Sequence, residues 1–138
     1  MWTRYNYEHP ALIGTYGMLP GDGVDVEILG NTFTKILSTW NFEKTWGWDF
    51  PMLAMTAARL NRPEDAIDFL LHENFSFDQH GLAYSMKGPY PYFPANGGLL
   101  TAVAMMAGGW YGAEQTNSPG FPENGKWKVR YEKFNKMP

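Results

Sequence analysis

The sequence predicts an all-α domain built of helical hairpins, with one short β-strand near the C-terminus. Apolar residues recur at helical spacing in several segments, and clusters of glycine and proline separate those segments. One stretch near the end alternates apolar and basic residues, which is typical of a half-exposed strand. The chain has 138 residues, so we expect one domain or part of one, because a chain this short rarely holds two cores.

The first third of the chain predicts two helices. A short helix is expected over residues 11–18, where the Leu-Pro-Gly-Asp-Gly cluster of residues 19–23 ends it. A longer helix is expected from Asp25 to about Trp40, because its apolar residues recur three or four positions apart and form one stripe. The aromatic and glycine-containing residues 41–49 are expected to form a loop.

A tight helical hairpin follows this loop. Asp49 precedes Phe50 and Pro51, and a carboxylate followed by an early proline predicts an N-cap and a helix over residues 50–60. Pro63 breaks that helix, and the acidic residues after it open a second helix that runs to about residue 71. So short a connection forces the two helices to be antiparallel neighbours.

Residues 74–94 lack helical periodicity, and a loop this long within a compact domain is usually functional. Asn96 is expected to cap a last helix over residues 99–107, whose small residues predict a central, tightly packed position. The tail contains the alternating residues 127–131, which predict the strand. We therefore divide the chain into a helical domain at 1–112 and a tail with one strand at 113–138.

Composition excludes several classes of function. The net charge of −3 gives no electrostatic reason to bind nucleic acid. The absence of cysteine excludes disulfides, thiolate nucleophiles and zinc knuckles. No apolar stretch reaches the ~18 residues of a membrane span, so no membrane is expected as a partner. The N-terminal residues do not have the pattern of a signal peptide.

Aromatic loops and a few polar residues are the candidates for a binding site. Asp49 is the best local carboxylate for a catalytic role, although an N-cap alone also explains it. Trp40, Trp46 and Trp48 crowd one loop, where tryptophan can stack on a sugar or fill the ends of helices in the core. Glu8 and His9 precede a proline, and His9 either contacts a hydroxyl or carboxylate of the site or only staples its loop.

Two further candidates lie in the second half of the chain. His80 is expected to line a cleft formed by the long loop. Asn96 is expected to contact a sugar hydroxyl or a water molecule at the N-terminal end of the last helix. His72, Glu73, Asp78 and His80 do not follow a helical zinc-binding spacing, so no metal is expected. Glycines 97 and 98 lack the lysine and preceding strand of a phosphate-binding loop, and close helix packing explains them better.

Three segments, in order, carry a resemblance to a known family. Residues 8–21 contain Glu-His-Pro and end in Tyr-Gly-Met-Leu-Pro-Gly. Residues 46–60 contain Trp-Gly-Trp-Asp-Phe-Pro and lead to Ala-Arg-Leu, and residues 96–102 read Asn-Gly-Gly-Leu-Leu-Thr-Ala. Together they resemble the C-terminal part of six-hairpin (α/α)6-barrel glycoside hydrolases, especially bacterial members and, more distantly, the family 95 fucosidases.

The resemblance implies a partial (α/α)6 toroid and a C-terminal fragment of a glycoside hydrolase-like protein that hydrolyses O-glycosyl bonds. It also implies an oligo- or polysaccharide partner, no cofactor and a periplasmic or extracellular location. Pro94 and Ala95 stand where the fucosidases carry a base-side aspartate, so the fucosidase mechanism does not transfer. Twelve helices of ~12 residues need far more chain than this. The missing hairpins are expected from an upstream segment or a homo-oligomer, and apolar helix faces should otherwise be exposed.

Two alternatives remain at this point. The chain could be a noncatalytic carbohydrate-binding or assembly module that keeps the aromatic loops and lacks the acid pair. A polysaccharide lyase on a related toroid is the other alternative, but it requires basic residues near an acidic sugar, and these are sparse in the loops.

Overall fold

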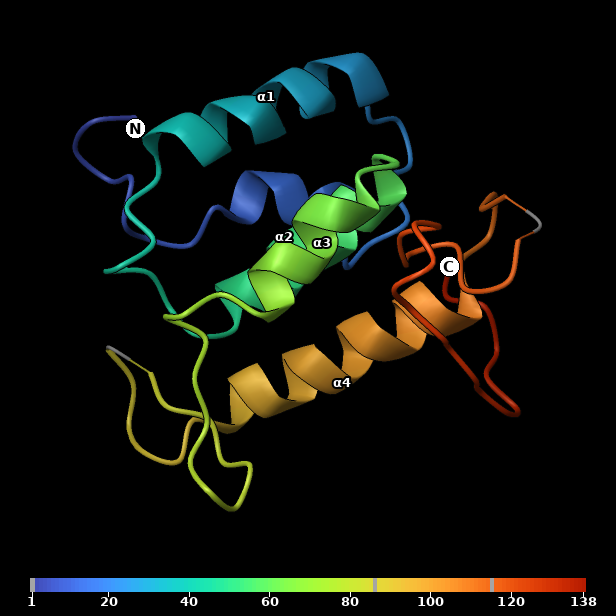
Figure 1. Ribbon diagram of the computed structural model, residues 1–138. Helices are drawn as coiled ribbons and strands as arrows, with labels where there is room; N and C mark the ends of the chain where they lie inside the picture. The colour runs from blue at the N-terminus through green and yellow to red at the C-terminus, as the bar shows by residue number, and fades with distance from the viewer. Residues whose placement is uncertain (1, 86, 115) are drawn as a thin grey trace.

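The computed structural model describes residues 2–85, 87–114 and 116–138, and these residues form helices and loops without a strand. In chain order the helical elements are the 3-10 helix η1 and the α-helices α1 to α4 (Figure 1). Their bounds are η1 Ala11–Tyr16, α1 Val26–Thr39, α2 Asp49–Arg59, α3 Pro63–Leu70 and α4 Phe93–Gly108. The all-α prediction is therefore confirmed.

Helix α1 has the predicted position and the predicted buried stripe. The Asp25 carboxylate caps it by accepting a hydrogen bond from the Ile28 amide at 3.0 Å. Leu29, Phe33 and Ile36 are its buried residues. The Phe33 ring meets the Phe69 ring of α3 edge-on, with 6.1 Å between centroids, so α1 and α3 share one hydrophobic core.

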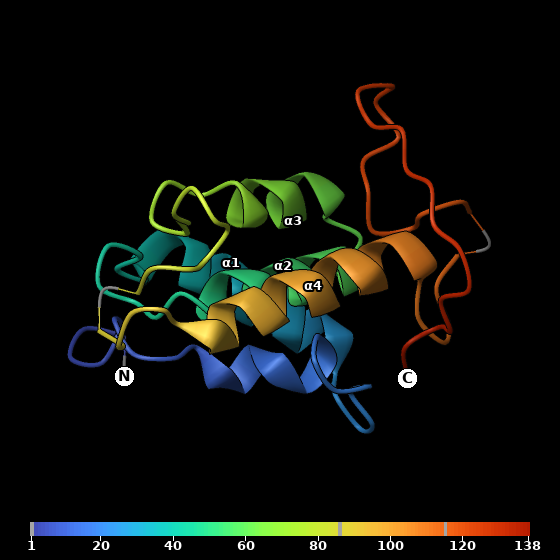
Figure 2. The same ribbon diagram turned by 90° about the horizontal axis from the view of Figure 1, so that it is seen from below.

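The hairpin of α2 and α3 is confirmed, and α2 is the central helix of the fold. Every residue of α2 is buried, and the helix packs against η1, α3 and α4 (Figures 1 and 2). Its alanines allow neighbouring helices to approach closely. A β-carbon on Gly17, after η1, would lie 2.8 Å from the backbone nitrogen of Thr56, so the chain there contacts the α2 backbone directly.

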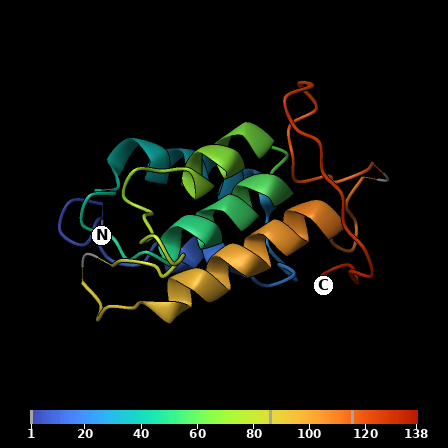
Figure 3. The ribbon, with the colours of Figure 1, turned by 60° about the horizontal axis from the view of Figure 1, so that its bottom comes forward.

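Helix α4 begins earlier than predicted and is not central. It starts at Phe93, with Pro94 in its first turn, where a proline has no hydrogen bond to lose. The N-cap prediction for Asn96 is therefore wrong, because Asn96 lies inside the helix. Only one side of α4 packs on α2, and the helix lies along the edge of the bundle (Figure 3).

The outer side of α4 is apolar and uncovered. Leu100 is 72% exposed and Phe93 is 63% exposed, while Val103 beside them is exposed as well. Val26 and Ile28 are also exposed in the first turn of α1. Exposed apolar helix faces were expected from the sequence, and they are present.

The predicted C-terminal strand is wrong. Residues 127–131 alternate as predicted but have no strand partner among the described residues, and their conformation is irregular. The tail is instead attached to the end of α4 by an isolated parallel bridge between Trp110 and Met137. The Met137 amide donates to the Gly109 carbonyl at 3.0 Å, and its carbonyl accepts from the Tyr111 amide at 2.8 Å.

Across residues 2–85, 87–114 and 116–138, we find no helix that is both long enough and apolar enough to cross a membrane.

Candidate functional site

Glu8, His9 and Asp49 come together although about forty residues separate them in sequence. The segment before η1 passes over the start of α2, and His9 Nδ1 lies 2.8 Å from Asp49 Oδ1. The His9 side chain is 34% exposed, whereas Asp49 has no exposed surface. A buried carboxylate and a partly exposed imidazole therefore form a polar pair at the N-terminal end of the central helix.

Asp49 does not cap α2 with its side chain, so the N-cap prediction for this residue is wrong. It is the first residue of α2, and its carboxylate turns back toward the preceding loop. Oδ2 accepts hydrogen bonds from the Thr45 hydroxyl and, at 2.9 Å, from the Trp46 amide. Together with His9 these donors satisfy a buried charge that would otherwise be costly, and the positive end of the helix dipole adds to this.

Two of the three candidate tryptophans flank the histidine. The His9 ring centroid lies 5.3 Å from that of Trp46 and 4.9 Å from that of Trp48, and both indoles are partly exposed. Trp40 has a different role: it is buried, and its indole N–H donates to the Glu8 backbone carbonyl at 2.8 Å. Trp46 and Trp48 therefore belong to the site, whereas Trp40 holds the Glu8 segment in place.

Glu8 provides the accessible carboxylate of the cluster, with 47% of its side chain exposed. Its Oε1 lies 3.3 Å from Lys87 Nζ, and its Oε2 lies 3.5 Å from the Trp46 indole nitrogen. Lys87 also donates to the Tyr7 carbonyl at 3.0 Å. A cavity of about 480 Å³ adjoins this pair and is lined by Tyr7, Lys87 and the side chains of residues 43 and 44.

The loop before α4 forms one wall of the cluster. The Tyr92 ring lies 5.8 Å from the Trp46 ring, and burial, followed by the negative charge of Asp49, raises the pKa of Tyr92 above its ordinary value. A β-carbon on Gly47 would lie 3.1 Å from the Tyr84 carbonyl, so the loop packs directly on the Trp46–Trp48 turn.

Two sequence candidates lie outside the cluster. The Asn96 amide group is occupied within the protein: Oδ1 accepts from the Ala83 amide at 3.0 Å, and Nδ2 donates to the Gly81 carbonyl at 2.7 Å. It fastens the long loop to α4. His80 is exposed in that loop, and its ring forms a hydrogen bond with the neighbouring Gln79.

No group of three or more His, Asp or Glu side chains in the described part of the chain is placed to hold a metal ion. His72, which the metal interpretation included, packs instead on Phe50, with 4.8 Å between ring centroids.

Sequence reasoning missed two members of the cluster. Thr45 had a signal, because it lies four residues before the carboxylate it binds, at the entry to a predicted helix. Lys87 had none, because it reaches the site through the fold of the irregular loop.

The arrangement can bind a polar ligand and move a proton. An ionised Asp49 can only accept a hydrogen bond, so Nδ1–H of His9 donates to it and Nε2 is the ring nitrogen left for a ligand. Glu8 offers a carboxylate to hydroxyl donors, and the indoles of Trp46 and Trp48 offer apolar surface beside it. No protein-family model, curated protein or solved structure matches the chain, so this interpretation rests on the geometry of the site itself.

Proposed function

We propose that this chain is carbohydrate-active and binds an oligo- or polysaccharide at the cluster of Glu8, His9, Trp46 and Trp48. One observation carries the proposal: residues that the sequence marked in two distant segments meet at a single partly exposed site. Indole rings beside a carboxylate and an imidazole suit a sugar, which presents an apolar C–H face and a ring of hydroxyl donors.

Within this proposal Glu8 and His9 contact the sugar, and Asp49 is a positioning residue that acts through His9. Asp49 was our sequence candidate for catalysis, but a carboxylate with no exposed surface reaches a ligand only through its hydrogen-bonded partner. Hydrolysis of a glycosidic bond needs two carboxyl groups on opposite sides of that bond. Glu8 supplies one of them, and a second has to come from beyond this cluster.

We further propose that the second carboxylate lies on additional helical hairpins, which complete an (α/α)6 toroid together with α1 to α4. The uncovered apolar side of α4, with Leu100 and Phe93, supports this, because helices of a complete barrel bury such surfaces against their neighbours. Either an upstream segment or further copies of the chain supply these hairpins. The complete protein then acts as a glycoside hydrolase-like enzyme.

The alternative is a noncatalytic carbohydrate-binding or assembly module. It is favoured by the fact that Glu8 is already paired with Lys87, while Asp49 is fully buried. Such a module binds saccharide with the same aromatic and polar residues but does not turn it over.

Saccharide binding is tested by titrating the 138-residue chain with neutral oligosaccharides and following the indole N–H signals by NMR. We expect Glu8→Gln to weaken binding at least about tenfold, because a hydrogen bond to a charged group contributes about 1.5–3 kcal/mol. Glu132→Gln, an exposed change in the tail, is the matched control. The absence of any binding, or equal binding by both variants, would overturn the proposal.

Catalysis is tested separately, by turnover of aryl glycosides. We expect Asp49→Asn to shift the pH profile of kcat in the complete protein, because the partner that fixes the His9 tautomer is changed. Binding without turnover in every form of the protein would favour the module.

A further inference from the structure

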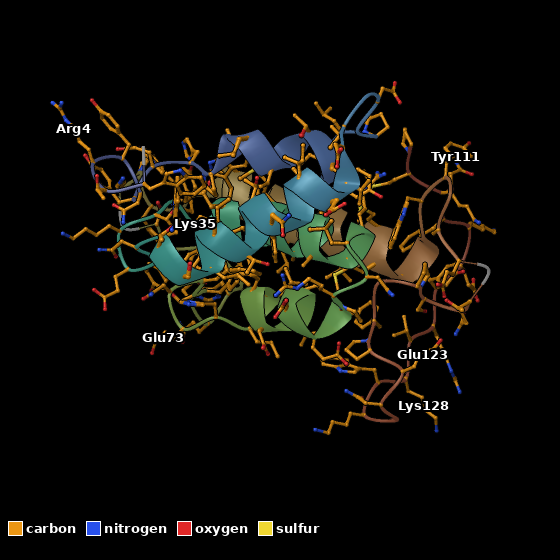
Figure 4. All side chains as sticks on the ribbon, turned by 90° about the horizontal axis from the view of Figure 1, so that it is seen from above. Arg4, Lys35, Glu73, Tyr111, Glu123 and Lys128 are labelled. Carbon is orange, nitrogen blue, oxygen red and sulfur yellow. The ribbon has the colours of Figure 1, made fainter. Side chains whose placement is uncertain are left out.

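A separate cavity lies at the end of α2 opposite Asp49. Its volume is about 550 Å³, and it is enclosed by the end of α2, the start of α3 and the segment that follows α4. Figure 4 shows Glu123, one of its lining residues, at the same end of the bundle as Tyr111, while Arg4 and Glu73 lie at the other end. None of our sequence candidates lines this cavity.

Arg59 is a buried cation in the wall of this cavity. It is the last residue of α2 and only 8% exposed. Its guanidinium carbon lies 5.9 Å from the centroid of the Tyr16 ring and 5.8 Å from that of Trp110. The aromatic faces and the carbonyl end of the helix partly compensate the charge.

The hydrogen bonds of Arg59 are incomplete. Nη2 donates to the main-chain oxygen of Pro138, but the buried Nε has no partner among the described residues. No side-chain carboxylate in the described part of the chain lies within ion-pair distance of the guanidinium. Burial lowers the pKa of Arg59 from its ordinary value. A planar guanidinium in this state is suited to a carboxylate.

The remaining charges of the cavity are negative. Glu64, Glu114 and Glu123 line it and are exposed, so its described side chains carry 1 − 3 = −2 charges in total. A phosphate or other multiply charged anion would be repelled by these carboxylates. Ammonium groups of a ligand would relieve the mutual repulsion of these carboxylates. Hydroxyl groups of a ligand would offer hydrogen bonds but no positive charge.

From this charge pattern we infer that the cavity binds a free amino acid with a basic side chain. Its α-carboxylate pairs with Arg59, and its ammonium groups lie among Glu64, Glu114 and Glu123. The apolar rings of Tyr16 and Trp110 border the aliphatic part of the ligand. The inference does not depend on the proposed saccharide site, which lies at the other end of α2, so either one can fail without the other.

The test compares three ligands on the unmodified chain by isothermal titration and by NMR of the Trp110 indole signal. L-Lysine has the carboxylate and two ammonium groups, L-lysinamide lacks the carboxylate, and gluconate has a carboxylate but only hydroxyl groups. We expect L-lysine to bind at least tenfold more tightly than either of the other two. Equal affinity for L-lysine and L-lysinamide would show that Arg59 accepts no ligand carboxylate, and would overturn the inference. Gluconate binding as tightly as L-lysine would overturn it as well.

Two variants locate the contacts. Arg59→Met should lower the affinity for L-lysine at least tenfold and leave that for L-lysinamide unchanged, because only the first ligand pairs with the guanidinium. Glu64→Gln should weaken both ligands. Arg4→Met, an exposed change at the far end of the bundle, is the control for charge. If Arg59→Met does not fold, the comparison of the three ligands on the unmodified chain still decides the question.

Discussion

Gly97 and Gly98 are neighbours on α4 but face different surroundings, and this makes a paired test of the helix packing. A β-carbon on Gly98 would lie 2.7 Å from Cγ and 3.4 Å from Cβ of Pro51, whereas one on Gly97 would have no neighbour within 4 Å. Neither glycine has a positive φ, so both positions accept alanine without backbone strain. The two substitutions therefore differ mainly in the contact with α2.

The magnitude follows from two opposing terms. Replacing glycine by alanine inside a helix stabilises it by up to about 1 kcal/mol, and this gain is similar at both positions. Overpacking against a rigid proline ring costs about 1–3 kcal/mol, and only Gly98 meets such a ring. We therefore expect Gly97→Ala to be stabilising, and Gly98→Ala to be less stable than Gly97→Ala by about 1–3 kcal/mol.

Urea unfolding of the two variants, followed by circular dichroism at 222 nm, measures this difference directly. The slope of the unfolding free energy with urea should be the same in both, so that the midpoints report stability alone. Equal midpoints for the two variants would refute the close packing of α4 on α2. A more stable Gly98→Ala would refute it more strongly, because the ring of Pro51 would then not be where α4 meets α2.

Three further outcomes are expected. Asp49→Asn should lower the free energy of unfolding by about 2–3 kcal/mol, because it weakens the hydrogen bonds that satisfy a buried carboxylate, while the exposed Asp68→Asn should change it little; equal effects in urea unfolding would be inconsistent with this burial. The hydrogen bond to Asp78 raises the pKa of Tyr90 to about 12, so its contribution to stability is complete below the ordinary tyrosine pKa of about 10 and is lost as the pH rises through 12. Absorbance at 295 nm should show this late titration step, and Tyr90→Phe should remove it; a step that persists in the variant belongs to another tyrosine. Leu100→Gln should change the unfolding free energy by less than about 0.5 kcal/mol but reduce self-association in sedimentation runs, since Leu100 is exposed; a large loss of stability would mean that this surface is covered.

The helices with one apolar stripe were predictable because their packing is encoded by local spacing. Leu29, Phe33 and Ile36 lie on one side of α1 as their spacing requires, and Pro63 opens α3 as the break in the pattern requires. Helix α4 was harder, because it is apolar on all sides and its spacing does not identify a buried face. Pro94 lies in the first turn of α4, where proline is common, and is therefore a signal for the start of this helix. The residues before it lack helical periodicity, and for that reason we placed this proline in the loop.

The prediction of a C-terminal strand was wrong for a different reason. Alternation over residues 127–131 describes a segment that suits a sheet, but a strand also needs a neighbour with free backbone groups. The tail instead forms backbone hydrogen bonds from Met137 to Gly109 and Tyr111, and no periodicity in the sequence predicts this contact.

The candidate site was half predictable. The sequence marked Glu8, His9, Trp46 and Asp49 separately, because each is a polar or aromatic residue next to a break in structure. That His9 bonds to Asp49 was not predictable, because nothing local relates residues forty positions apart. The same holds for Lys87, which reaches Glu8 from the long loop.

The burial of Asp49 links the site to the stability of the fold. Two of its donors, from Thr45 and Trp46, lie within four residues and form whenever the loop and the helix form. The third, from His9, exists only when the N-terminal segment docks on α2, where the Thr56 hydroxyl donates to the Ile13 carbonyl at 3.1 Å. Docking therefore does two things at once: it covers the carboxylate and orients the imidazole. Since a buried charge that loses a partner is strongly destabilising, the protein cannot keep Asp49 buried and release His9 without a large free-energy cost. The orientation of the His9 ring is therefore already fixed in the folded protein before a ligand binds. This lowers the entropy cost of binding a ligand to His9.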